Sequence, residues 1–118
     1  MNKILNQKRN ECLNLIRISS RIVNRVRTGY NEGKNHIELK HQVCKNLASE
    51  GKAFVTEAIF KTGYRADIVV LDDFKIIEIV SSEREKSLLN KAKNYPKGLK
   101  IEIKRCNDAA KRMGKTKI

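Results

Sequence analysis

The most constraining feature of this chain is a pair of β-branched, apolar runs on either side of two adjacent acidic residues. The runs occupy residues 64–71 and 74–81, and Asp72-Asp73 lies between their ends. This pattern is typical of an antiparallel β-hairpin with a tight turn. The sequence therefore predicts two adjacent strands in the middle of the chain, joined by an acidic turn.

The hairpin brings two carboxylates together. If Asp72 and Asp73 form the whole loop, paired residue numbers sum to 145, and Asp67 lies directly opposite Glu78. Opposite side chains have Cβ atoms about 4.5–5.5 Å apart, where like charges destabilise the sheet unless a cation lies between them. The pair therefore predicts a divalent-metal site. The alternative is an exposed hairpin face on which Arg65 or a lysine neutralises the carboxylates.

Length and charge narrow the class of protein. The 118 residues suffice for one domain with a modest core. Lysine and arginine number 26 against 13 acidic residues, a net charge of +13. Such a basic chain indicates a polyanionic partner, most simply nucleic acid, although a solvated basic surface or a ribosome-type protein has the same composition.

No apolar run approaches the ~20 residues of a membrane span. We expect no membrane partner and a cytoplasmic location, or the host cytoplasm if the protein is viral.

The three cysteines are spaced far apart. No CxxC pair or Cys/His cluster is present, so the sequence favours buried thiols over a zinc site. One disulfide is compatible only with an oxidising or hyperthermophilic setting. The cysteines are Cys12, Cys44 and Cys106.

Apolar spacing predicts the remaining elements. A basic N-terminal helix over residues 3–27 carries arginines at i, i+4 and i+8, and further helices are expected at 36–50, ended by Gly51, and at 82–95. Strands are expected at 53–60, 64–71, 74–81 and 99–104. The fold class is α/β, with a mixed sheet flanked by helices and an extra basic helix at the N-terminus. The predicted segments are 1–34 (basic helix packed on the same domain), 35–106 (core) and 107–118 (basic tail).

A third carboxylate has two candidates, Glu38 and Glu57. Glu38 follows Asn35 by three residues, so its alternative role is to cap its own helix. Glu57 lies on the strand before the hairpin, where a solvent-facing position is the alternative. His36 and His41 flank Glu38 and are expected to be structural, although His41 shares the face of Glu38 and can contact a phosphate or tune that carboxylate.

The order of these motifs resembles the PD-(D/E)xK nucleases, which include restriction endonucleases and archaeal Holliday junction resolvases. A helix with Glu38 precedes Arg-Ala-Asp-Ile (65–68) and Ile-Glu-Ile (77–79), and a helix and a strand follow. The resemblance covers about residues 36–105 and is strongest to small archaeal or archaeal-virus members. It implies a restriction endonuclease-like sheet.

The resemblance also implies chemistry. Asp67 and Glu78 are expected to bind Mg²⁺ or Mn²⁺, assisted by the carbonyl of Ile79, and Glu38 is expected to orient a metal-bound water. The implied function is metal-dependent hydrolysis of phosphodiester bonds in DNA. We expect a homodimer, because a chain this small has little surface to grip a duplex and cutting both strands needs two sites.

The chain departs from the family at the motif lysine, where it has Val80. The predicted register pairs this position with Arg65, whose guanidinium can clamp a phosphate or stabilise its charge but cannot act as a base. Arg65 is therefore a candidate catalytic residue. The alternative is that Arg65 neutralises Glu78 in an inactive descendant.

Basic side chains outside the acidic pair are candidates for phosphate contacts, with a solvated face as the alternative. Two other functions stay open: a nucleic-acid-binding protein that does not cleave, and a basic structural or assembly protein. The candidate phosphate-binding residues are Arg17, Arg21, Arg25, Arg84 and Lys86.

Overall fold

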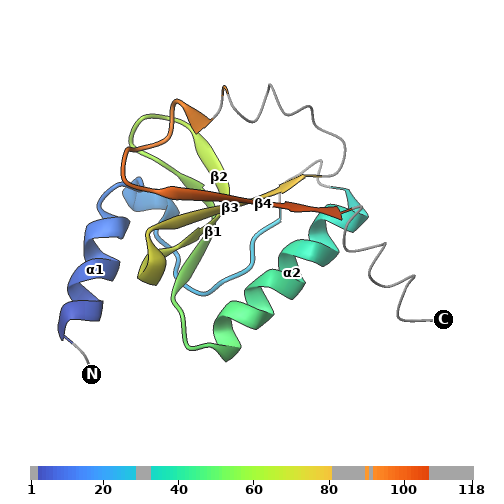
Figure 1. Cartoon of the computed structure of the whole chain (residues 1–118), viewed down its shortest axis with the longest axis horizontal. Helices are drawn as coiled ribbons and strands as arrows, with labels where there is room; N and C mark the ends of the chain where they lie inside the picture. The colour runs from blue at the N-terminus through green and yellow to red at the C-terminus, as the bar shows by residue number, and fades with distance from the viewer. Residues whose placement is uncertain (1–2, 29–32, 81–89, 91, 107–118) are drawn as a thin grey trace.

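The computed structural model describes residues 3–28, 33–80, 90 and 92–106, and a four-stranded mixed sheet forms its centre (Figure 1). The first three strands are antiparallel neighbours in chain order, and the fourth lies parallel to the third. The predicted α/β class and all four predicted strands are confirmed. The strands are β1 (Phe54–Ile59), β2 (Arg65–Val70), β3 (Lys75–Val80) and β4 (Lys100–Arg105).

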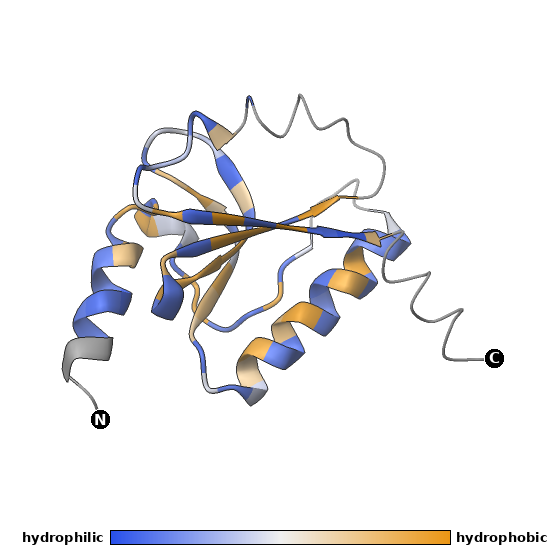
Figure 2. Ribbon diagram, viewed as in Figure 1, coloured by the Kyte–Doolittle hydropathy of each residue, from blue (hydrophilic) through white to orange (hydrophobic). Residues whose placement is uncertain are grey.

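One face of the sheet is covered by α2 (Lys34–Ser49), along which hydrophobic residues recur between hydrophilic ones (Figure 2). The helix ends before Gly51, which has a φ of +74°. A glycine adopts this left-handed conformation without the strain that a Cβ imposes, so the predicted stop is confirmed. The buried cluster shared by the helix and this face of the sheet contains Val43, Cys44, Leu47, Phe54, Ile68, Val70, Ile77, Ile79 and Cys106.

The N-terminal helix is shorter than predicted. Helix α1 spans Lys3–Leu13, whereas the spacing of apolar residues predicted a helix over 3–27. The prediction is wrong beyond Leu13 because the later residues bond to the sheet. The Arg17 N–H donates to the Ile59 carbonyl at 2.7 Å, and residues 18–20 form a single 3₁₀ turn, η1 (Ile18–Ser20).

This segment covers the outer edge of β1. Asn24 has a φ of +58°, and its N–H donates to the Phe54 carbonyl at 2.7 Å. Its side-chain oxygen accepts the Phe54 N–H at 2.9 Å, and Val23 forms an isolated bridge with Val55. Pairing β1 in this way satisfies backbone groups that an open strand edge exposes.

A second buried cluster joins the end of α1 to the sheet. It combines Cys12 and Ile16 of the N-terminal segment with strand residues and with Tyr95. The N-terminal segment therefore packs on the same domain as the sheet. The cluster contains Cys12, Ile16, Ala53, Val55, Ala58, Phe60, Ala66, Val69, Leu71, Ile76 and Tyr95.

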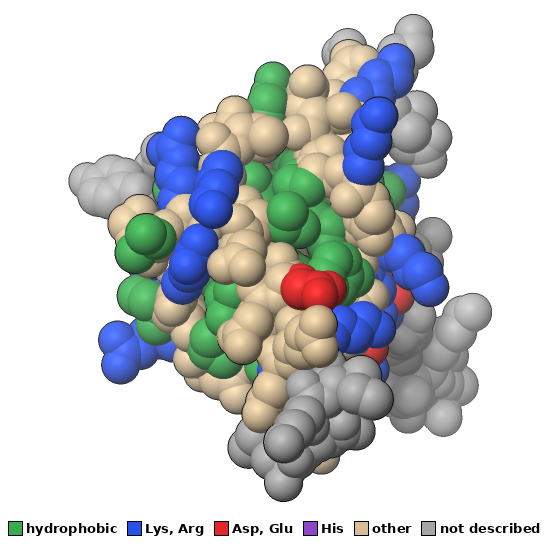
Figure 3. All heavy atoms as spheres, turned by 90° about the vertical axis from the view of Figure 1, so that its left-hand side faces the viewer, with side chains coloured by type: hydrophobic (Ala, Val, Ile, Leu, Met, Phe, Trp, Pro, Cys, Tyr) green, Lys and Arg blue, Asp and Glu red, His purple; other side chains and the backbone are tan. Residues whose placement is uncertain are grey.

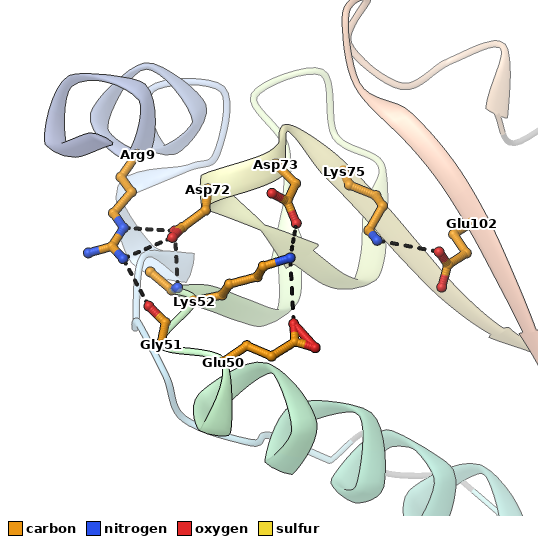
Figure 4. A network of polar contacts seen from close by, with 9 residues as sticks. Arg9, Glu50, Gly51, Lys52, Asp72, Asp73, Lys75 and Glu102 are labelled. Carbon is orange, nitrogen blue, oxygen red and sulfur yellow. Dashed lines mark hydrogen bonds and ion pairs between the residues drawn. The ribbon is translucent and has the colours of Figure 1, made fainter. Parts of the chain in front are cut away.

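The turn between β2 and β3 is tied to α1 by an acidic network (Figure 4). Asp72 accepts two hydrogen bonds from the Arg9 guanidinium, at 2.7 and 2.9 Å, and a third from the Ala53 N–H at 3.1 Å. The turn is longer than the predicted two-residue loop, because it is a 3₁₀ turn, η2 (Leu71–Asp73), followed by Phe74 at a φ of +48°.

Part of the predicted organisation lies outside the described residues. The helix expected at 82–95 falls mostly on residues 81–89 and 91, and the basic tail falls on 107–118. Over the residues that the structure does describe, no helix has the length and apolar character of a membrane span.

Candidate active site

The hairpin register is confirmed up to the acidic pair. Ile68, Val69 and Val70 pair with Ile77, Ile76 and Lys75, so the paired numbers sum to 145 as predicted. The backbone ladder stops there, one residue before Asp67 and Glu78.

Beyond this point the carboxylates of Asp67 and Glu78 take over the hydrogen bonding between β2 and β3. Asp67 Oδ2 accepts the Ile79 N–H at 2.8 Å, and Glu78 Oε2 accepts the Asp67 N–H at 2.9 Å. Asp67 and Glu78 are therefore close together, as predicted. Each carboxylate accepts a hydrogen bond from the backbone of the neighbouring strand. These bonds fix the position of two charged groups where the strands separate.

Glu78 is almost completely buried, with 3% of its surface exposed. Tyr95 donates its hydroxyl proton to Glu78 Oε1, and the same hydroxyl oxygen lies 3.1 Å from the Arg65 carbonyl. The Tyr95 ring packs edge-on against Phe60, with ring centroids 5.5 Å apart. The contacts of Tyr95 at this site were not predicted, because they come from strands distant in the sequence.

Helix α2 directs His36 and Lys40 at the sheet. His36 Nε2 lies 3.5 Å from Asp67 Oδ2, and Lys40 Nζ lies 3.7 Å from Glu57 Oε2. Lys40 is fully buried and also donates to the Arg27 carbonyl at 2.9 Å. The contacts of both residues went unpredicted. A signal exists in the sequence: positions 36, 40, 43 and 47 share one helical face with the buried Val43 and Leu47.

Glu38 lies on the exposed part of α2. The capping alternative for this residue is wrong, because α2 begins at Lys34 with Gly33 as its N-cap and without a side-chain cap hydrogen bond. Its role in orienting water stays a prediction. His41 is also exposed.

Glu57 belongs to the same row of the sheet as the acidic pair. The pairs Thr56 with Ile68 and Ala58 with Ala66 flank it, which sets Glu57 opposite Asp67. Its φ is +50°, a value that is rare for a residue with a Cβ. Such a strained backbone conformation persists only where the surrounding contacts impose it. The predicted alternative of a solvent-facing strand residue is wrong, because only 12% of the Glu57 side chain is exposed.

The expected pairing of Arg65 with Val80 is absent from the described ladder. Arg65 has an exposed side chain, and β2 and β3 have separated at its position. Val80 is 2% exposed and pairs with Arg105 of β4. The structure instead places the ammonium group of Lys40 3.7 Å from Glu57, which lies opposite Asp67 in the sheet.

The predicted arginine stripe does not exist as a helical feature. Arg17, Arg21 and Arg25 lie after the end of α1, in the segment that runs along the edge of β1. Arg21 Nε donates to the Ile16 carbonyl at 2.9 Å. Arg17 and Arg25 have exposed side chains. Figure 3 shows lysine and arginine side chains spread over the face that carries α1. The other two candidates, Arg84 and Lys86, lie outside the described residues.

The two carboxylates fit a magnesium-type ion better than a softer metal. Mg²⁺ is usually held by one or two carboxylates, and water and phosphate oxygens complete its shell. Among the described residues, no group of three or more His, Cys, Asp or Glu is arranged to hold a metal. Carboxylate oxygens are the ligand type that such an ion prefers, and Asp67 and Glu78 are the residues that would hold it.

Comparison with known proteins gives no relative for this chain: no protein-family model matches, and neither does a curated protein or a solved structure. The function is therefore argued from the site itself.

Proposed function

We propose that this chain is a metal-dependent nuclease that hydrolyses phosphodiester bonds in DNA, with a restriction endonuclease-like arrangement of its sheet. The observation that carries the proposal is the reciprocal anchoring of Asp67 and Glu78 across the separating strands. Fixed carboxylates at a strand end are a preorganised oxygen site, which lowers the cost of binding a divalent ion.

Asp67 and Glu78 are the proposed ligands of Mg²⁺ or Mn²⁺. When bound, such an ion supplies Lewis-acid chemistry, which activates water and offsets the charge of a phosphate. The neighbouring residues hold the ligands in place. Tyr95 orients Glu78 through its hydroxyl, and the Ile79 N–H orients Asp67.

Lys40 is the proposed source of the positive charge that Val80 cannot provide. Its ammonium group is buried beside Glu57, in the row of the sheet that also contains Asp67. In the proposed role Lys40 holds the Glu57 carboxylate in place beside Asp67, because a buried cation stabilises nearby carboxylates. Arg65 keeps the proposed role of contacting a phosphate, since its side chain is exposed.

The proposed DNA affinity rests on charge. The net charge of +13 and the exposed arginines Arg17 and Arg25 support binding to a phosphate backbone without base recognition. We expect the logarithm of the binding constant to fall steeply with the logarithm of salt concentration.

The test is cleavage of supercoiled plasmid, single strands and a four-way junction in Mg²⁺ or Mn²⁺, with EDTA as control. Cleavage that is abolished by EDTA supports the nuclease proposal, and the form of DNA that is cut fastest identifies the substrate class.

A second candidate, a nucleic-acid-binding protein without cleavage, is favoured by the buried Val80 at the position of the motif lysine. Salt-sensitive binding without cutting in either metal supports that candidate and contradicts the first.

A further inference from the structure

We propose that β4 pairs in antiparallel fashion with β4 of a second copy, joining two sheets into one through Ile103. This inference goes beyond the proposed function and does not depend on it. In the described part of the chain, β4 is the last strand of the sheet and pairs with β3 alone. An edge strand presents a row of backbone donors and acceptors to any strand that can align with it.

The hydrogen bonds to β3 decide which residues face outward. The Lys100 N–H donates to the Phe74 carbonyl at 2.9 Å, so Lys100 directs its backbone groups at β3. Alternate residues of a strand direct these groups to opposite sides. Glu102 and Lys104 therefore also bond inward, while Ile101, Ile103 and Arg105 direct their N–H and C=O groups outward.

Only registers that pair outward residues with outward residues can form a hydrogen-bonded ladder. With Ile103 on the two-fold axis, Glu102 lies opposite Lys104 of the second copy, twice per dimer. Shifting the axis to Glu102 places two glutamates opposite each other, and shifting it to Lys104 places two lysines opposite each other. An axis at Ile101 also pairs opposite charges, but it uses three residues of β4, whereas the Ile103 axis uses five.

Exposed apolar surface supports the same register. Ile101 and Ile103 are each 40% exposed, and they alternate with charged residues along β4 (Figure 2). Pairing around Ile103 places the two Ile103 side chains against each other on one face. The opposite face receives the Glu102 and Lys104 pairs, beside a cavity that both residues help to line.

The register has a consequence for the acidic pair. Ile103 is the partner of Glu78 in the β3–β4 ladder, so Glu78 and its equivalent in the second copy lie on one row of the joined sheet. Strands are spaced about 4.8 Å apart, so three intervals separate the two β3 strands by about 14 Å. Residues that pair across an antiparallel two-fold share a face, so both acidic pairs address the same side of the dimer.

The test is sedimentation of the full chain over a wide range of concentration, with two charge variants, Glu102→Lys and Lys104→Glu. Each variant alone places like charges opposite each other and is expected to raise the dimer dissociation constant roughly tenfold or more. An equimolar mixture of the two restores both opposite-charge pairs, so it is expected to form heterodimers as tight as the parent dimer. Ile18→Asp, at a residue 80% exposed and distant from β4 in the chain, is the control and is expected to dimerise normally.

Circular dichroism checks that each variant is folded, and Ile103→Thr, which keeps a β-branched residue, provides a second disruption of the same contact. A parent chain that is monomeric at every concentration overturns the proposal. So do single variants that dimerise like the parent, or a mixture that remains monomeric. The measurement needs no DNA or metal, so its outcome is separate from that of the nuclease proposal.

Discussion

Asp67 and Glu78 each hold the backbone of the strand that carries the other. Asp67 Oδ2 accepts the Ile79 N–H at 2.8 Å, while Glu78 Oε2 accepts the Asp67 N–H at 2.9 Å. Hydrogen bonds from N–H groups to ionised carboxylates are among the stronger ones in proteins. The separation of β2 and β3 and the placement of two negative charges therefore have a common cause.

Lys40→Met is expected to lower the free energy of unfolding by about 3 kcal/mol, because removing one partner leaves a buried charge uncompensated. Glu57, with a 12% exposed side chain, loses its cation, and the Arg27 carbonyl loses a donor. Urea unfolding measures the effect. Lys45→Met, at an exposed lysine of the same helix, is the control, and equal losses in both variants contradict a specific role for Lys40. The double variant Lys40→Met/Glu57→Gln is expected to recover part of the loss.

Arg9→Met is expected to weaken the fold at neutral pH and to matter less in acid. Burial alone raises the pKa of Asp72, but hydrogen bonds from Arg9 and the Ala53 N–H, together with the charges of Arg9 and Lys52, outweigh it and lower that pKa. A carboxylate with a lowered pKa stabilises the fold above its unfolded-state pKa of about 4, and this contribution is lost as pH falls through the folded-state pKa.

The expected loss in Arg9→Met is about 1 kcal/mol at neutral pH, shrinking below about pH 4. Unfolding by urea from neutral pH to about pH 3 measures it, with Lys8→Met on the same helix as the control. A loss that stays constant across this range contradicts the assigned ion pair.

The thiols are expected to react slowly in the folded chain. Burial raises the pKa of Cys12 and of Cys44 to about 11, against the smaller opposing effects of Lys8 and Lys40, and it also raises the pKa of Cys106. Thiolate is the reactive form, and a raised pKa keeps it scarce below about pH 9. A coloured disulfide reagent is expected to label the cysteines fully in denaturant and slowly without it. Fast labelling of the native chain at neutral pH contradicts this burial.

The hairpin was predictable because its pattern is local. Alternating β-branched residues around an acidic turn predicted the register of β2 and β3. The predicted register is correct even though the turn is longer than two residues. Residues 14–27 were not predictable in the same way. The spacing of Ile16, Ile22 and Val23 suits a helix, but hydrogen bonds to β1, some 30 residues away in the chain, outweigh that local preference.

The acidic pair was likewise found from register, whereas its other contacts depend on packing between elements. Which face of α2 meets the sheet is decided by the burial of Val43 and Leu47, and that face carries His36 and Lys40 and leaves Glu38 exposed. Tyr95 reaches Glu78 through folding of distant segments, which no short pattern encodes.

The most direct test of the central claim is nicking of supercoiled plasmid in Mg²⁺ or Mn²⁺ by the parent chain and by Asp67→Asn. Asp73→Asn, which changes an aspartate in the nearby turn that pairs with Lys52 at 2.8 Å, is the matched control. We predict metal-dependent nicking by the parent and by Asp73→Asn, and a loss of at least about a hundredfold in Asp67→Asn. Nicking by Asp67→Asn at the parent rate, or no nicking by the folded parent chain in either metal, contradicts the account.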